Sequence, residues 1–118
     1  MNAPAAKLAT GVPLAQALIA ESFGTDRGCL VIGGFRVPDL LAAYGSPLYV
    51  YDGDVIERRY GALARAVEGF AEVYYSIKAN PNPAVARLMV DRGAGLEIAS
   101  GAELRLALRA GARPERIL

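Results

Sequence analysis

The feature that most limits how this chain can fold is a regular alternation of strand-like and helix-like segments from residue 47 to residue 118. Residues rich in β-formers occur at 48–51, 73–78 and 96–99, and a helical pattern follows each of them. A further strand-like segment begins at residue 116. Strands that alternate with helices at a step of roughly two dozen residues predict a parallel sheet with right-handed helical connections.

The number of repeats decides how much of a fold the chain contains. A (β/α)₈ barrel consists of eight such units in about 250 residues. This chain of 118 residues has three units and the start of a fourth. The pattern alone is also compatible with an open parallel sheet, but we expect an α/β protein that is the N-terminal part of a (β/α)₈ TIM-type barrel, incomplete as given.

Three segments are expected along the chain. Residues 1–27 form a lead-in segment with one helix, residues 28–46 form a strand and a helix that precede the barrel, and residues 47–118 form the first part of the barrel. The turn-prone residues 24–28 are expected to close the lead-in segment, and Gly33-Gly34 to end the short strand that follows.

Local signals predict where the barrel helices start and which face of the first one is buried. The predicted starts are a capping box of Asp54 and Glu57, an Asn82 cap before Pro83, and a second capping box of Ser100 and Glu103. The first helix carries an apolar stripe at spacings of four and three, formed by Ile56, Tyr60, Leu63, Val67 and Phe70.

Composition excludes several classes of partner and site. Thirteen basic and twelve acidic residues give a formal charge of +1 without a basic stripe, so we expect no nucleic-acid partner. The chain has no histidine and one cysteine, Cys29, which predicts no metal site, no internal disulfide and a reducing cytoplasm. The apolar runs in residues 1–23 are too short for a signal peptide or a membrane span, so no membrane partner is expected.

Lysine is rare in this chain and one lysine has a notable place. The two lysines are Lys7 and Lys78, and Lys78 lies at the carboxyl end of a predicted strand, where active sites of parallel α/β folds form. Strand parity directs Ser76 and Lys78 away from the helices, and parity in the next strand does the same for Glu97. We therefore expect Lys78 and Glu97 to be neighbours on adjacent strands.

A lysine beside a carboxylate allows two interpretations. Burial lowers the pKa of a lysine amine toward neutrality, and a free amine attacks an aldehyde to form an imine. The alternative is a structural ion pair between Lys78 and Glu97, which the spacing alone favours. Helix capping likewise explains Ser100 and Glu103, with a phosphate contact as the alternative, and a turn after the strand explains Asn80.

Three ordered motifs narrow the choice. They are residues 45–52 (GSPLYVYD), 75–80 (YSIKAN) and 95–104 (GLEIASGAEL). Together they resemble the fold-type III pyridoxal phosphate-dependent decarboxylases, most of all their diaminopimelate decarboxylase branch, over residues 28–118. The resemblance implies pyridoxal 5'-phosphate as the cofactor, held as a Schiff base by Lys78, with Glu97 in place of an acidic residue that is often aspartate. It also implies that the strand at Leu30 belongs to a second, β-rich domain.

By the same resemblance, the activity would be decarboxylation of a basic or diamino acid, as in lysine biosynthesis, with diaminopimelate as the first substrate to test. An amino-acid racemase of the same barrel type and a non-catalytic binding homologue are the alternatives. The family's ring-stacking histidine, glycine-rich phosphate loop and partner-subunit cysteine have no counterpart in the 118 residues. We therefore expect a homodimer for the full-length protein and no activity for this chain as a fragment.

Overall fold

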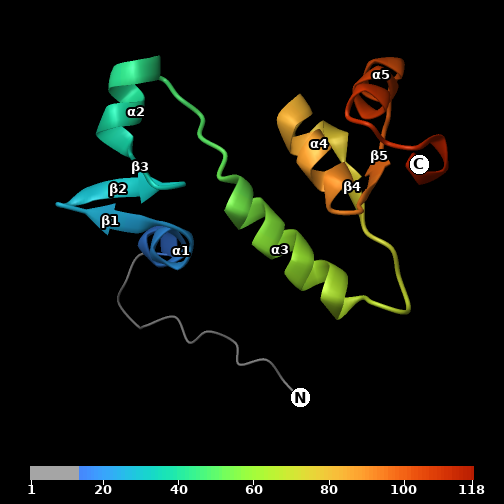
Figure 1. The fold of residues 1–118 in the computed structure, drawn as a ribbon, viewed down its shortest axis with the longest axis horizontal. Helices are drawn as coiled ribbons and strands as arrows, with labels where there is room; N and C mark the ends of the chain where they lie inside the picture. Colours follow the sequence, from blue (N-terminus) through green and yellow to red (C-terminus); the bar gives the residue numbers. More distant parts are fainter. Residues whose placement is uncertain (1–13) are drawn as a thin grey trace. The chain divides into compact units, whose positions relative to one another are not determined.

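The computed structural model describes residues 14–118, which form two compact units divided between Asp52 and Gly53 (Figure 1). The lead-in helix is present as α1 (Leu14–Ser22), and the part of the lead-in segment before it lies outside the described residues. None of the helices in residues 14–118 has the length and apolar character needed to cross a membrane. The expected domain limits after residues 27 and 46 stay predictions.

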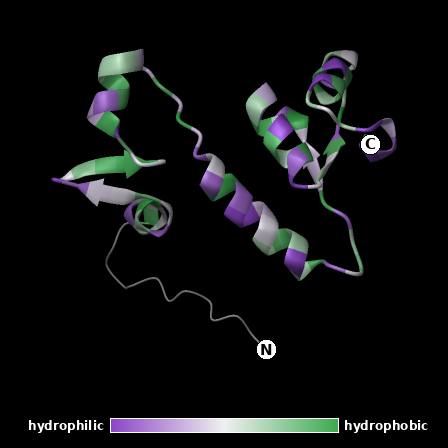
Figure 2. Ribbon diagram, in the orientation of Figure 1, coloured by the Kyte–Doolittle hydropathy of each residue, from purple (hydrophilic) through white to green (hydrophobic). Residues whose placement is uncertain are grey.

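The first unit contains a three-stranded antiparallel sheet in the order β1-β2-β3, formed by Gly24–Asp26, Cys29–Ile32 and Phe35–Arg36. Two-residue turns, Arg27-Gly28 and Gly33-Gly34, join the strands, and φ is positive at all four positions, as type I′ turns require. The strand β2 is hydrophobic throughout (Figure 2). The expectation that residues 24–28 form a turn is wrong for the first three, because a two-residue turn leaves them free to pair.

A short helix and a connecting segment complete this unit. The helix α2 (Val37–Tyr44), predicted within residues 28–46, has Pro38 in its first turn and ends before Gly45. Residues 48–51, expected as a strand, belong to neither sheet in the described part of the chain. Their β-forming side chains favour an extended backbone, but a strand also needs partners for its N–H and C=O groups.

The second unit alternates helices and parallel strands, as the sequence predicted. Its elements are α3 (Gly53–Ala66), β4 (Tyr74–Ser76), α4 (Pro83–Asp91), β5 (Gly95–Glu97) and α5 (Gly101–Arg109), with 3-10 turns η1 (Ile77–Ala79) and η2 (Pro114–Arg116). The strands β4 and β5 are parallel, with Ser76 opposite Glu97. Ile117 forms a parallel bridge to Leu96, which confirms the start of a further strand.

The core of this unit lies between the strands and the helices α4 and α5 (Figure 1). Its two largest fully buried side chains are Ile77 and Leu96. The other buried residues of this cluster are alanines, which let the helices approach the sheet closely: Ala86, Ala107, Ala110 and Ala112.

Both core helices end in the same way. After α4, Gly93 takes a φ of 93° and the N–H of Ala94 bonds to the carbonyl of Met89 at 3.0 Å. After α5, Gly111 takes a φ of 87° and the N–H of Ala112 bonds to the carbonyl of Ala107 at 3.1 Å. These are Schellman motifs, in which glycine supplies the left-handed residue that stops the helix and returns the chain to the sheet.

The apolar stripe of α3 is only partly buried. Hydrophilic and hydrophobic residues are mixed along this helix (Figure 2). Ile56 and Tyr60 pack against the core cluster of α4, but Leu63 is 51% and Phe70 77% exposed. Leu63 lies within the helix and lines the apolar groove, and Val67 is partly buried. The prediction is wrong for Phe70, because the helix ends at Ala66 before reaching it. An open apolar groove of about 430 Å³ remains between α3 and β4.

The predicted capping box at the start of α3 is also absent. The helix begins at Gly53, so Asp54 lies within the first turn and not before it. A residue with helical backbone angles cannot act as the N-cap. The partner expected for it, Glu57, instead forms an ion pair with Arg92 of the segment after α4, with its Oε1 2.6 Å from the guanidinium Nη2.

Candidate active site

The candidate site lies where the parallel strands β4 and β5 end. Ser76 is the last residue of β4 and Glu97 the last residue of β5, and the two are directly paired in the ladder. Lys78 follows Ser76 but is not in the strand, contrary to the sequence-based expectation. It lies in the 3-10 turn η1, which the N–H of Asn80 closes by bonding to the carbonyl of Ile77 at 3.1 Å.

Hydrogen bonds of the following segment explain why the strand stops before Lys78. The hydroxyl of Tyr75 donates to the carbonyl of Asn80 at 2.9 Å, and the Asn80 side chain accepts the N–H of Asn82 at 3.1 Å. Asn82 in turn caps α4 by accepting the N–H of Ala84 at 2.9 Å, with Pro83 at the first helical position. The predicted roles of Asn80 and Asn82 are both confirmed, and together they fold the chain into a turn where a strand would otherwise continue.

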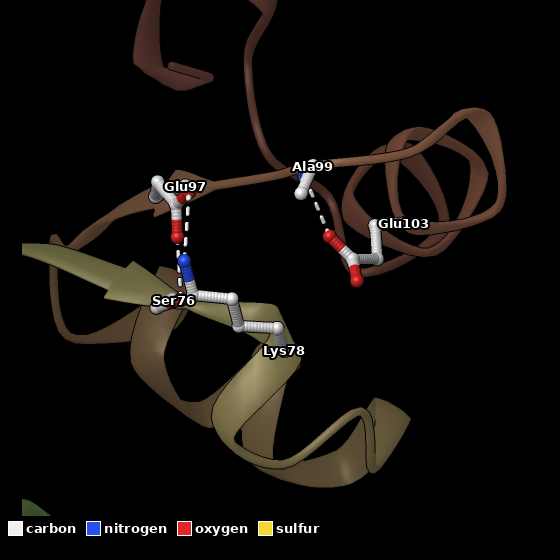
Figure 3. Close-up of polar contacts among 5 residues, drawn as sticks. All are labelled: Ser76, Lys78, Glu97, Ala99 and Glu103. Carbon is white, nitrogen blue, oxygen red and sulfur yellow. Dashed lines mark hydrogen bonds and ion pairs between the residues drawn. The ribbon is translucent and has the colours of Figure 1, made fainter.

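The side chains of Lys78 and Glu97 are neighbours, as predicted, although Lys78 comes from the turn after β4 and not from the strand (Figure 3). The amine Nζ of Lys78 lies 3.8 Å from Oε1 of Glu97, and the hydroxyl of Ser76 donates a hydrogen bond to Oε2 of the same carboxylate. The Lys78 side chain is 66% exposed and that of Glu97 30% exposed. The described residues therefore do not bury the Lys78 amine, which the imine interpretation had considered. They leave the amine accessible to an incoming molecule.

The neighbouring residues Ser100 and Glu103 have a structural role. The N–H of Glu103 donates to the Ser100 hydroxyl at 3.2 Å. The Glu103 carboxylate accepts the N–H of Ala99 at 2.6 Å (Figure 3). The Ser100 hydroxyl thus satisfies one of the N–H groups in the first turn of α5, where four such groups lack a partner within the helix. The Glu103 carboxylate returns to the N–H of Ala99, the residue before the N-cap, and not to the N–H of Ser100 that a capping box uses. The structural interpretation of Ser100 as a cap is confirmed.

The Lys78 amine and the Glu97 carboxylate fit the aldehyde group of pyridoxal phosphate. A primary amine that is open to solvent can bond covalently to an aldehyde carbon, and the adjacent carboxylate of Glu97 can compensate the positive charge on nitrogen. Sequence reasoning missed the third member, Ser76. Strand parity could have indicated this residue, because it places Ser76 on the same face of the sheet as Glu97.

Comparisons with known proteins show to which family the chain is related. Residues 53–118 match the family model described as the pyridoxal binding domain of pyridoxal-dependent decarboxylases. A diaminopimelate decarboxylase from Aquifex aeolicus is 43% identical over 91 residues, which are 77% of this chain and 21% of that protein. An L-glutamyl acyl-carrier-protein decarboxylase from Niallia circulans is 40% identical over 83 residues, which are 70% of this chain and 19% of the relative.

Solved structures have the same fold. A crystal structure of an Aquifex aeolicus protein matches with a TM-score of 0.80 and 38% identity, over 86% of this chain and 25% of the other. A diaminopimelate decarboxylase from M. jannaschii matches with a TM-score of 0.76 and 29% identity, over 85% of this chain and 25% of the other.

These matches decide between the two folds left open by the sequence. The family model starts at residue 53, where the second compact unit also starts. The strands and helices of that unit correspond to part of a decarboxylase barrel, so the barrel interpretation is confirmed over the open sheet. The chain spans about a fifth of the length of the curated relatives that it matches. The match of residues 53–118 to the family model and the identity with curated relatives show that this chain belongs to the family of pyridoxal-dependent decarboxylases.

Proposed function

We propose that this chain carries the cofactor-anchoring lysine of a pyridoxal phosphate-dependent decarboxylase that acts on a diamino acid. The observation that carries the proposal is the place of Lys78. Its amine is accessible, lies 3.8 Å from a carboxylate oxygen of Glu97, and follows a parallel strand within the residues matched by the pyridoxal binding domain. Active sites of barrel enzymes form at this end of the strands.

The roles of the two residues follow from their chemistry. Bound pyridoxal phosphate supplies an electron sink for the charge that remains when carbon dioxide leaves an amino acid. Lys78 would hold the cofactor covalently through Nζ, and its amine, once displaced by the substrate amine, could carry a proton. Glu97 would stabilise positive charge at the same place, since its Oε1 faces the lysine amine.

Diaminopimelate is the first substrate to test, because several relatives are diaminopimelate decarboxylases. The relative named as an L-glutamyl acyl-carrier-protein decarboxylase gives a second substrate to test. Decarboxylation of either substrate requires an amino group that displaces the lysine and a carboxylate that is lost as carbon dioxide. The residues Lys78 and Glu97 would act on this shared part of either molecule.

Reductive trapping tests the proposal. The longest chain that the gene encodes is incubated with pyridoxal phosphate, reduced with borohydride and mapped by mass spectrometry. We expect a pyridoxyl group on Lys78, none on Lys7, and none at position 78 in the Lys78→Arg variant. Full-length protein without an adduct on Lys78 would overturn the enzyme proposal and favour a binding homologue.

Product analysis separates the two enzyme classes. With either substrate, a decarboxylase releases carbon dioxide from the carboxylate, whereas a racemase inverts the α-carbon and releases none. We expect release of carbon dioxide by the wild-type protein and none by Lys78→Arg. Inversion of the α-carbon without loss of carbon dioxide would support the racemase.

A further inference from the structure

We infer that Ser76 is a positioning residue for Glu97: its hydroxyl holds one carboxylate oxygen so that the other faces the amine of Lys78. The inference rests on the proposed function, because it concerns how Lys78 is prepared to bind pyridoxal phosphate. It assigns a task to a residue that lies one position from a fully buried core residue, Ile77.

The backbone register brings Ser76 and Glu97 together. They are opposite each other in the parallel ladder, at the last position of β4 and of β5. Opposite residues in a ladder direct their side chains to the same face of the sheet. The neighbouring residue Leu96 points to the other face and is fully buried in the core, which fixes the parity of β5. The contact is therefore built into the sheet.

The two carboxylate oxygens of Glu97 have separate partners. An ionised carboxylate only accepts hydrogen bonds, so the Ser76 hydroxyl must be the donor to Oε2. The amine of Lys78 lies on the side of Oε1. Figure 3 shows Ser76 and Lys78 both directed at Glu97, with Lys78 coming from the turn after β4.

The hydrogen bond from Ser76 is the stronger constraint on the Glu97 carboxylate. A separation of 3.8 Å between Lys78 Nζ and Glu97 Oε1 is too long for a hydrogen bond, and an ion pair with an exposed lysine holds its partner weakly. Hydrogen bonds to a charged group are shorter and stronger than neutral ones, and the Ser76 contact is of this kind. Removing the hydroxyl would leave a flexible glutamate side chain with only the weak partner.

The test compares four variants of the longest chain that the gene encodes: Ser76→Ala, Ser76→Thr, Glu97→Gln and the double variant Ser76→Ala/Glu97→Gln. For each, the pyridoxal phosphate concentration that gives half-maximal borohydride trapping on Lys78 is measured by mass spectrometry. We expect Ser76→Ala to raise this concentration by about 3- to 10-fold, which is the change in an equilibrium constant expected from the loss of one hydrogen bond. Ser76→Thr keeps a hydroxyl in a strand that accommodates β-branching and should stay within about twofold of wild type.

The double variant separates positioning from general damage to the fold. If Ser76 acts through Glu97, Ser76→Ala has no further effect once Glu97 is glutamine. An equal loss in both backgrounds, or a failure of Ser76→Thr to restore trapping, would overturn the inference. Thermal unfolding of the cofactor-free variants checks their folding. Ser76→Cys, a residue of similar size with a weak donor, replaces Ser76→Ala if that variant does not fold, with the same expected loss.

The outcomes also distinguish this inference from the proposed function. Absence of trapping on Lys78 in the wild-type protein would overturn the proposed function. Trapping on Lys78 that is unchanged in Ser76→Ala would overturn only the positioning role of Ser76 and leave the proposed function standing.

Discussion

The amine of Lys78 and the carboxylate of Glu97 lie 3.8 Å apart because two parallel strands end side by side. Neither residue is placed by its neighbours in sequence alone. The register of β4 and β5 puts Glu97 opposite Ser76, and the 3-10 turn after Ser76 holds Lys78 over the same strand end. The pair therefore depends on the ladder between the strands and on the turn that follows β4.

Loss of the Glu97 charge should affect cofactor capture more than stability. We expect Glu97→Gln to raise the pyridoxal phosphate concentration needed for trapping on Lys78 by about 3- to 10-fold, while the free energy of unfolding changes by less than about 1 kcal/mol, because exposed ion pairs contribute little. Titration with reductive trapping and urea unfolding measure the two effects. Glu97→Asp keeps the charge, so the pyridoxal phosphate concentration that it needs should lie between those of the wild type and Glu97→Gln. If Glu97→Gln needed the same concentration as the wild type, the prediction would be contradicted.

Removal of the cap of α4 should destabilise the protein. Asn82→Ala deletes the side-chain oxygen that accepts the N–H of Ala84 at 2.9 Å. The expected loss is about 1 kcal/mol in the free energy of unfolding, measured with urea. Asn82→Asp retains an acceptor at the same position and serves as the matched control. Equal losses for the two variants would show that the cap bond is not the cause.

A methyl group at position 95 should not fit. A Cβ built on Gly95 would overlap the ring of Tyr74 on the neighbouring strand. We expect Gly95→Ala to lower the free energy of unfolding by about 1 to 3 kcal/mol, a common cost of overpacking. In a Tyr74→Ala background the same substitution should cost much less. Gly24→Ala, which meets nothing within 4 Å, is the control and should be close to neutral.

The guanidinium of Arg116 should contribute through several contacts. It lies 2.7 Å from the Glu72 carboxylate, donates to the Gly93 carbonyl at 3.1 Å and stacks over the Tyr74 ring at 5.1 Å. We expect Arg116→Ala to cost about 1 to 2 kcal/mol in urea unfolding.

A control separates the contacts of Arg116. The Glu72 side chain is 64% exposed, so Glu72→Gln should cost less than about 0.5 kcal/mol. A cost for Glu72→Gln as large as that for Arg116→Ala would mean that the ion pair, and not the carbonyl and ring contacts, provides the stabilisation.

Signals that act over a few residues were readable from the sequence. The Asn82 cap and the Ser100 cap each depend on residue types within one helical turn. Strand parity, with a period of two, correctly placed Ser76 and Glu97 on one face of the sheet. Lys78 reaches that face from the 3-10 turn after β4, which parity does not describe. The fold of the second unit was predictable because its strands and helices each have such a local pattern.

Features that depend on distant partners or competing turns were not readable. Residues 48–51 have strand-forming side chains, but whether a ladder forms depends on another segment. The turn at Lys78 is set by the Tyr75 hydroxyl and the Asn80 side chain, which compete with continued strand pairing. The bond between Ser76 and Glu97 requires the register of two strands, which parity alone does not give.

The matching ends of α4 and α5 bear on how such a protein can change during evolution. Gly93 and Gly111 stop successive helices with the same backbone geometry, and each returns the chain to the sheet beside the previous strand. Strand-end residues can therefore be exchanged while the backbone that holds them stays the same. A protein of this kind can evolve specificity for a new substrate through a few substitutions at the strand ends, without a change of fold.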